Sequence, residues 1–258
     1  MLRRYSKLAP ILNWGLFVIG GAYSVASIAG LTGYPPTEGV VAGDAYNYWQ
    51  GQAYSDPDYR YSPAFYWATA PLRALPFEIF VSIWTALHLL AVAWLAPWMA
   101  VVAFDDVIRG NINVFLAVGL VVAVTGRPWA WAGMLLTKVT PGVGIAYHIG
   151  RREWGSVAIA GGTTLAIAAV TWPFGLWPEW FASLVAGTSN YETIDFLGPL
   201  PFRIALGLLL SLAAARWIWL LPLSVILAMP GLWPSTFALL AALPRLIAFS
   251  ATRGKKNP

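Results

Sequence analysis

A polar, aromatic segment with one central carboxylate lies between two apolar stretches of this sequence. It runs from Gly43 to Tyr54 and carries these candidate polar side chains near its start: Asp44, Tyr46, Asn47, Tyr48 and Gln50. A carboxylate can remove the proton of an attacking hydroxyl group, and aromatic and amide side chains can stack on a sugar and hydrogen-bond to it. The segment therefore indicates a site that handles a polar, hydroxyl-bearing substrate.

Asp44 has a second interpretation that involves no chemistry. If residues 44–54 form a short helix, Asp44, Asn47 and Tyr48 share one face, because side chains three and four positions apart are neighbours. An aspartate at the start of a helix also caps it by accepting a backbone N–H. A cap and a catalytic base are compatible, so both interpretations stay open.

Lys138 is the second candidate, since it lies inside an apolar stretch over residues 128–149. An ammonium group at the centre of a bilayer costs at least about 2.5 kcal/mol, so it needs a function or a partner. Pro141 should break or kink the helix just beyond it. A cation beside a broken helix predicts an anion site, such as one for a lipid phosphate. The alternatives are that Lys138 snorkels to the interface or pairs with a buried carboxylate.

Weaker signals lie close to these two candidates. Arg60 with Tyr61 could hold a phosphate, although an arginine near Asp56 and Asp58 is more often part of a surface ion pair of little energetic weight. The two aspartates could also bind a divalent cation, but the sequence supplies no further ligands for them. We therefore predict a phosphate contact here and no metal.

The histidines do not suggest a metal or cofactor site. His88 lies on an apolar helix and is expected to be a packing residue, and His148 is expected at a membrane interface. The pair Asp105–Asp106 is expected on the cytoplasmic side, and Gly161–Gly162 is expected at a close helix contact. The sequence holds none of the common nucleotide-binding, hydrolase or metalloprotease motifs. No metal and no cofactor are predicted.

Composition sets the class of protein. Hydrophobic residues make up 59% of the chain and charged residues 10%, against about a quarter charged in soluble domains, and the mean hydropathy is +0.64. The chain is therefore predicted to be an integral membrane protein, and its 15 tryptophans suit membrane interfaces. The net charge of +5 is attributed to topology signals rather than to nucleic-acid binding. The absence of cysteine excludes disulfides.

About eight apolar segments are long enough, or nearly so, to cross a bilayer as helices. Continuous apolar runs without alternation favour helices over a barrel. We predict an all-α, polytopic membrane protein with one domain over residues 1–258 and about eight transmembrane helices. The segments cover residues 8–32, 76–103, 111–126, 128–149, 155–175, 200–215, 217–230 and 234–250.

Lysine and arginine residues predict the orientation. With eight spans, ten basic residues near the ends of the segments share one side, which the positive-inside rule makes cytoplasmic. These are Arg3, Arg4, Lys7, Arg109, Arg151, Arg152, Arg216, Arg253, Lys255 and Lys256. Both termini are then cytoplasmic. Two long loops, over residues 33–75 and 176–199, face outward and hold most of the acidic residues, and the first is expected to contain short amphipathic helices.

Several short motifs follow one another in a characteristic order. They are Asp44–Tyr48, Gly51–Tyr54, Tyr61–Pro63, Pro71–Pro76, Gly110–Asn113, Lys138–Pro141 and Arg151–Trp154. In this order the sequence is similar to the polyprenyl-phosphate-sugar-dependent glycosyltransferases of the GT-C superfamily, most of all to the GT87 group of bacterial mannosyltransferase-like and arabinosyltransferase-like membrane proteins. The segment around Asn190, followed by Arg203, has a fainter likeness to the same group.

The resemblance implies an activity, a side of the membrane and roles for residues. It implies a shortened inverting enzyme of the bacterial cytoplasmic membrane. Such an enzyme moves a mannose- or arabinose-like sugar from a polyprenyl-phosphate donor to a hydroxyl of a glycan, glycolipid or protein acceptor, on the extracytoplasmic side. Asp44 becomes the general base, Lys138 a contact for the donor phosphate, and Arg60, Tyr61 and Asn190 further contacts with substrate. The family usually needs no metal.

Two departures from the family keep other functions open. Where the family has Gly-Gln-x-Asn, this chain has Gly110-Asn111-Ile112-Asn113, and the chain is shorter than usual. A non-catalytic subunit of a membrane complex would use the aromatic loops as a docking surface. A carrier or flippase for a lipid-linked sugar would use the same polar groove without breaking a bond.

Overall fold

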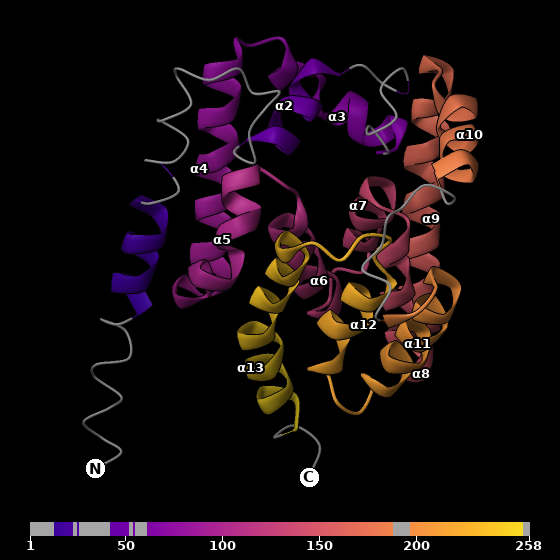
Figure 1. The fold of residues 1–258 in the computed structure, drawn as a ribbon. Helices are drawn as coiled ribbons and strands as arrows, with labels where there is room; N and C mark the ends of the chain where they lie inside the picture. The colour runs from indigo at the N-terminus through magenta and orange to yellow at the C-terminus, as the bar shows by residue number, and fades with distance from the viewer. Residues whose placement is uncertain are drawn as a thin grey trace.

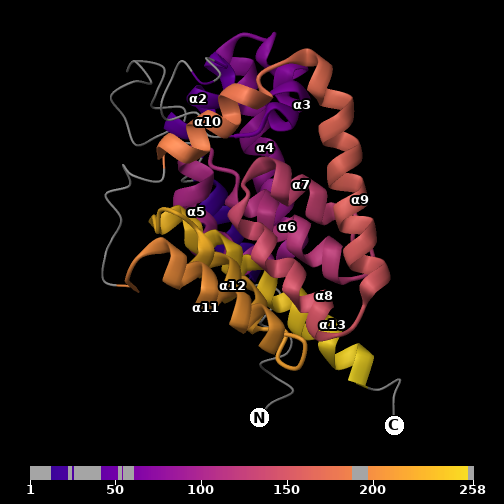
Figure 2. The ribbon, with the colours of Figure 1, turned by 90° about the vertical axis from the view of Figure 1, so that its right-hand side faces the viewer.

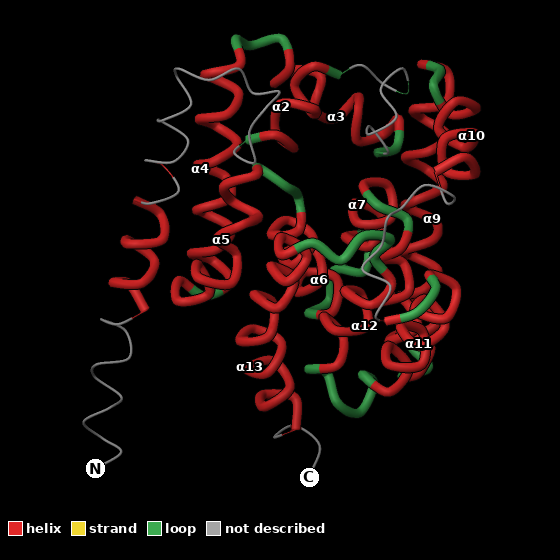
Figure 3. The backbone as a smooth tube through the Cα atoms, viewed as in Figure 1, coloured by secondary structure: helices red, strands yellow, loops and turns green. Residues whose placement is uncertain are grey.

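The fold is an assembly of helices of very unequal length (Figure 1 and Figure 3). The computed structural model describes residues 13–22, 25, 42–51, 54, 61–187 and 197–254, and over these ranges the regular elements are all helical. The predicted all-α class is therefore confirmed. Three of these helical segments are long and apolar enough to cross a membrane, namely Phe77–Leu95, Trp154–Phe174 and Pro234–Arg253. The predicted span over residues 8–32 lies mostly outside the described residues, and the remaining predicted spans are shorter or broken.

Two short helices form the described part of the first predicted loop. Helix α2 covers Gly43–Gln50 and α3 covers Pro63–Arg73. Ser62 starts α3 by accepting a hydrogen bond from the N–H of Phe65 at 3.3 Å, and Pro63 follows it at the first helical position, where its missing N–H costs nothing. The Ser62 hydroxyl also donates to the carbonyl of Leu136, which fastens α3 to α7.

The predicted span over residues 76–103 is not one helix. Helix α4 (Phe77–Leu95) ends where Ala96 is extended, with φ of −171°, because a residue that precedes proline avoids helical geometry. A 3₁₀ turn at Pro97–Met99 leads into α5 (Ala100–Arg109), which packs back against α4 (Figure 1). The chain thus returns toward α2, which also packs on α4.

A second break separates two predicted spans into short helices. Helix α6 (Asn113–Val124) is followed by α7 (Ala130–Thr137), and Lys138 after it is extended, with φ of −136°. A 3₁₀ turn at Thr140–Ile145 then leads into α8 (Ala146–Gly150). The break predicted beside Lys138 is confirmed.

Two helices that are apolar on every face meet different surroundings. Helix α6 is buried among α4, α7 and the 3₁₀ segment Pro234–Ala242, as expected for a uniformly apolar helix in a core. Helix α9 (Trp154–Thr171), with the 3₁₀ turn Trp172–Phe174 that continues it, has only 6% of its apolar window buried (Figure 2). Such a surface is suited to lipid.

The remaining helices close the fold. Helix α10 (Trp177–Gly187) occupies the start of the second predicted loop, where Trp177 and Trp180 pack with Ala64 of α3 and Leu136 of α7. Helices α11 (Leu200–Ala213) and α12 (Leu220–Ala228) form an antiparallel pair, and α13 (Leu243–Gly254) ends the described chain (Figure 2).

Close helix contacts occur at different glycines from those expected. A Cβ added at Gly161 or Gly162 would meet nothing within 4 Å among the described atoms, so the predicted contact there is wrong. A Cβ at Gly207 would lie 2.7 Å from the carbonyl oxygen of Ser224, and one at Gly150 would lie 2.8 Å from that of Leu212. These two glycines let α11 approach α12 and α8 closely, as small residues do in membrane proteins.

Candidate active site

Asp44 lies in the first turn of α2, half-buried, and its carboxylate is held by a residue from a distant turn. The side-chain amide of Asn111 donates to Asp44 Oδ2 at 2.9 Å. The N-cap of α2 is Ala42, and no side chain caps this helix. The interpretation of Asp44 as an N-cap is therefore wrong, and its carboxylate points toward the turn between α5 and α6.

That turn can approach α2 only because it contains a glycine. Gly110 has φ of +67°, and a Cβ at this position would lie 2.5 Å from the Cβ of Ala45. Helix α4 holds the turn from the other side, where the indole N–H of Trp84 donates to the Gly110 carbonyl at 2.7 Å. His88 contacts the carbonyls of Trp84 and Asn111, so it packs against the turn, as predicted.

Asp106 organises the start of α6 from inside α5. It is fully buried, and its carboxylate accepts hydrogen bonds from the backbone N–H of Asn113 at 3.2 Å, from that of Val114 at 2.8 Å and from the Asn113 side chain at 2.9 Å. These are the donors that a helix N-terminus leaves unpaired. The Asn113 amide also donates to Asn111 Oδ1 at 3.2 Å, which orients the amide that reaches Asp44.

Lys138 completes this group, which we name the Asp44 cluster: Asp44, Asp106, Asn111, Asn113 and Lys138. The Lys138 ammonium lies 3.5 Å from Asn113 Oδ1 and 5.8 Å from the centre of the Tyr61 ring. It interacts electrostatically with Asp44 and Asp106. No ion pair within 4.0 Å joins it to a carboxylate among the described residues. The alternative of a tight buried pair is therefore not what the structure shows.

Two opposing effects act on the Asp44 carboxyl. Burial raises the pKa of Asp44 above its usual value, while the positive charge of Lys138 and the hydrogen bond from Asn111 both act to lower it. Burial is the larger effect, because removing a carboxylate from water disfavours its charged form. The result is a carboxylate that accepts a proton more readily than an exposed aspartate does, which suits a general base.

The other predicted side chains of α2 divide between two faces. Tyr48 is buried, and its hydroxyl lies 2.8 Å from that of Tyr61, whose ring lies beside Lys138. Tyr46 instead packs edge-on against Phe77 at 5.3 Å and accepts a hydrogen bond from Gln50 at 2.7 Å. Asp44 and Tyr48 thus share the cluster side of α2, whereas Tyr46 and Gln50 lie away from it.

Some predictions fall outside the described residues, and others need correction. Arg60 and Asn190 lie outside the described ranges. Asp105–Asp106 and Arg109 were expected at the end opposite Asp44, but the Ile108 carbonyl accepts a hydrogen bond from the Ala42 N–H at 2.7 Å, which places this segment beside α2. The break at Ala96 turns α5 back and causes the difference. His148 is buried within the fold, and its expected position at a membrane interface stays a prediction.

Asn111 and Asp106 were missed as site residues. The sequence signal for them was the motif Gly110–Asn113, whose spacing was recognised without a role for its residues. No cluster of three histidine, aspartate or glutamate side chains suited to a metal occurs in the described part of the chain.

An apolar cavity begins next to the Asp44 cluster. It has a volume of about 330 Å³ and lies between α6 and α7. Ile112 and Thr137, the neighbours of cluster residues, are at one end of it, and Trp129 is at the other. The wall between them is almost entirely apolar, so the space suits a hydrocarbon chain.

Comparison with known proteins identifies the family of this chain. The sequence model of glycosyltransferase family 87 matches residues 59–253, which is most of the chain. The chain belongs to glycosyltransferase family 87. The matched region includes the turn at Gly110–Asn113 and Lys138, and the predicted family and enzyme class are confirmed by it.

The name of one curated relative states the substrates of that relative. The chain is 32% identical over 95 residues to the polyprenol-phosphate-mannose-dependent alpha-(1-2)-phosphatidylinositol pentamannoside mannosyltransferase of Mycolicibacterium smegmatis. The match covers 35% of this chain and 21% of that protein, so the family 87 chain spans only a small part of its relative. No solved structure gave a significant match.

Proposed function

We propose that this family 87 chain moves a sugar from a polyprenyl-phosphate donor to an acceptor hydroxyl at the extracytoplasmic side of the membrane. The sugar is mannose- or arabinose-like, and the configuration at its anomeric carbon inverts. The observation that supports the proposal is the meeting of Asp44, Asn111 and Lys138, which come from three separate segments of the chain.

The chemistry is a single displacement. The acceptor hydroxyl gives its proton to the Asp44 carboxylate as its oxygen bonds to the anomeric carbon of the donor. The bond from that carbon to the phosphate oxygen breaks, and the polyprenyl phosphate leaves with the electron pair. The Lys138 ammonium stabilises the charge that develops on the leaving phosphate, as fixed cationic groups do in acyl and phosphoryl transfer sites.

The surroundings of the cluster suit such a donor. The apolar cavity between α6 and α7 starts at residues adjoining Asn111, Asn113 and Lys138, and it offers the polyprenyl chain a dry wall. A phosphate beside Lys138 would then join a hydrocarbon chain directed along α7. No nucleotide is needed, because the donor arrives through the lipid.

Basic residues at the end of the fold away from Asp44 support the proposed orientation, in which Asp44 faces the extracytoplasmic side. Arg151 donates hydrogen bonds to the Ala215 carbonyl and to the Glu153 carboxylate, and Arg253 donates to the same carboxylate. These arginines therefore lie together at the end of the fold away from α2. The positive-inside rule assigns that end to the cytoplasm. Arg109 was expected at that end too, but it lies on the Asp44 side and pairs with Asp105 at 3.0 Å.

The test is the variant Asp44→Asn, assayed with radiolabelled polyprenyl-phosphate mannose and membrane extract as a source of acceptors. Turnover should fall by about a hundredfold or more, while donor binding is retained. Asp105→Asn makes the same chemical change on α5 and should keep full activity. Undiminished turnover by Asp44→Asn would refute Asp44 as the base, and donor binding without transfer by the wild-type chain would indicate a non-catalytic or carrier role.

A further inference from the structure

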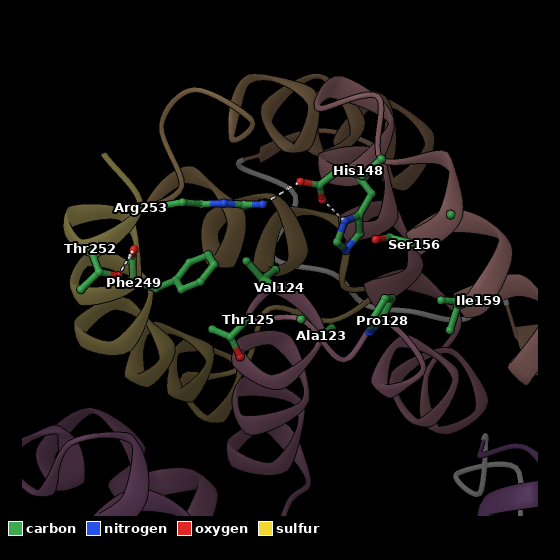
Figure 4. A pocket seen from close by; sticks show the side chains of 13 residues that line it. Ala123, Val124, Thr125, Pro128, His148, Ser156, Ile159, Phe249, Thr252 and Arg253 are labelled. Carbon is green, nitrogen blue, oxygen red and sulfur yellow. Dashed lines mark hydrogen bonds and ion pairs between the residues drawn. The ribbon is translucent and has the colours of Figure 1, made fainter. Parts of the chain in front are cut away.

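A separate cavity lies at the end of the fold away from Asp44. It has a volume of about 710 Å³ and is enclosed by residues of α6, α8, α9 and α13 (Figure 4). Val124, Ile159 and Phe249 give it apolar walls, and His148 and Arg253 enter it from different helices (Figure 4). None of these residues belongs to the Asp44 cluster.

His148 presents an unsatisfied nitrogen to this cavity. It is 2% exposed, and its Nδ1 lies 2.8 Å from Glu153 Oε2. An ionised carboxylate only accepts hydrogen bonds, so Nδ1 is the donor, and in the tautomer with a proton on Nδ1 the Nε2 atom is an acceptor. Nε2 is buried and has no hydrogen-bond partner among the described residues. Buried polar atoms are rarely left unpaired in native structures, which points to a ligand that supplies a donor.

An ion-pair group with an excess of positive charge adjoins the cavity, and two of its members, Glu153 and Arg253, line it. Glu153 is the shared partner of two arginines, since Arg151 bonds Oε1 at 2.8 Å and Arg253 bonds the same oxygen at 3.1 Å. One carboxylate therefore meets two guanidinium groups. A ligand with one negative charge would balance this group.

Lipid can reach the cavity from the side. Gly155, Ser156 and Ile159 form part of its wall, and they lie in the first turns of α9. Only 6% of the residues in the α9 window are fully buried, so the side of this helix that faces away from α7 is open to its surroundings. A headgroup in the cavity could thus be joined to acyl chains that lie along α9.

We propose that this cavity binds the headgroup of an anionic phospholipid that carries a free hydroxyl, such as phosphatidylglycerol. The phosphate lies against Arg253, a headgroup hydroxyl donates to His148 Nε2, and the acyl chains leave past Ile159 and Phe249. The site is independent of the proposed sugar transfer, because it shares no residue with the Asp44 cluster.

The first test fills the cavity. A Cβ at Gly155 meets nothing within 4 Å, so Gly155→Leu can occupy the cavity without displacing the backbone. Gly162→Leu makes the same change further along α9, where there is also open space, and serves as the control. Native mass spectrometry of the full chain in detergent should show one phosphatidylglycerol bound, with affinity reduced by about tenfold in Gly155→Leu and unchanged in Gly162→Leu.

The second test separates the parts of the headgroup. Wild-type protein should prefer phosphatidylglycerol to phosphatidylcholine, which lacks the net charge, and to phosphatidic acid, which lacks the hydroxyl. Arg253→Gln should weaken phosphatidylglycerol binding, whereas Arg127→Gln, an exposed arginine that does not line the cavity, should not. His148→Ala should abolish the preference over phosphatidic acid.

Three results would overturn the proposal. The first is equal retention of phosphatidylglycerol and phosphatidylcholine by the wild-type chain. The second is equal binding of phosphatidylglycerol by Gly155→Leu and Gly162→Leu. The third is displacement of bound lipid by soluble glycerol 1-phosphate at equal concentration, which would assign the cavity to a soluble anionic polyol. Sugar transfer is not a readout in any arm, so failure here leaves the role of Asp44 unaffected.

Discussion

The amide of Asn111 donates to Asp44 Oδ2 at 2.9 Å, across 67 positions of sequence. This bond fixes one carboxylate oxygen, and within the described part of the chain the other oxygen carries no hydrogen bond. Asn111 is itself oriented by Asn113, whose amide donates to Asn111 Oδ1. A base whose direction is set in this way needs no rearrangement when an acceptor hydroxyl arrives.

The bond to Asn111 should be visible in the pH dependence of activity. Asn111→Ala removes a hydrogen bond to a charged group, worth about 1.5–3 kcal/mol. The pKa of Asp44, already above its usual value because of burial, should rise further. Since only the ionised carboxylate accepts the proton, the acid limb of kcat/KM against pH should move to higher pH. An unmoved limb with reduced activity would assign Asn111 a purely structural role.

Lys138 should act on the same limb. The charge of Lys138 lowers the pKa of Asp44 more than the charge of Arg109 does. Lys138→Met should therefore move the acid limb of kcat/KM to higher pH. It should also lower kcat, because the leaving phosphate loses its counter-charge. Arg109→Met is the comparison and should produce a smaller shift. A larger shift in Arg109→Met would contradict the assignment of Lys138.

Gly110 should be intolerant of any side chain. Gly110→Ala places a Cβ 2.5 Å from that of Ala45 and forces a non-glycine residue to φ of +67°, so α2 must move away from the turn. Gly126→Ala, at φ of +114° with nothing within 4 Å of the Cβ, introduces backbone strain without the clash. Gly110→Ala should therefore lose transfer activity, and Gly126→Ala should lose only stability, as measured by Tm and sugar transfer. Equal activity losses would show that strain alone matters.

The two candidate residues, Asp44 and Lys138, could be picked out from the sequence because each differs in type from the residues around it. Asp44 is a carboxylate in an aromatic segment, and Lys138 is a cation in an apolar stretch with a proline just after it. These signals are local in sequence, and the helix break at Lys138 was also predicted from a nearby residue, Pro141. Their proximity in space was suggested only by the order of motifs.

The direction of α5 could not be read from hydropathy. Residues 76–103 are mostly apolar on both sides of Ala96, and only the extended geometry of Ala96 before Pro97 shows that the chain turns back. That turn brings Asp106 and Asn111 to α2, so the site residues that were missed are those positioned by the turn. Hydropathy also could not separate the buried α6 from the exposed α9, because both are apolar on every face.

Asp106 should be needed for folding rather than for chemistry. Asp106→Ala leaves the backbone N–H groups of Asn113 and Val114 and the Asn113 amide without their acceptor in a buried site. An unsatisfied buried donor costs about 1–3 kcal/mol, so Tm should fall by at least about 5 °C. Asp105→Ala, on the partly exposed side of α5, should change Tm by less than half as much. A small loss in Asp106→Ala would mean that the start of α6 finds other acceptors.

Arg203 should hold the end of α12 in a way that lysine cannot replace. It is 1% exposed, and its two terminal nitrogens donate to the carbonyls of Met229 and Pro230, each at 2.9 Å. A guanidinium spans two acceptors with fixed geometry, whereas an ammonium is a point charge on a flexible stem. Arg203→Lys should therefore cost about 2 kcal/mol and lower Tm. Arg245→Lys, whose arginine bonds one carbonyl from an exposed position, is the control and should leave Tm nearly unchanged. If the two variants have the same Tm, the carbonyls of Met229 and Pro230 do not depend on the guanidinium geometry of Arg203.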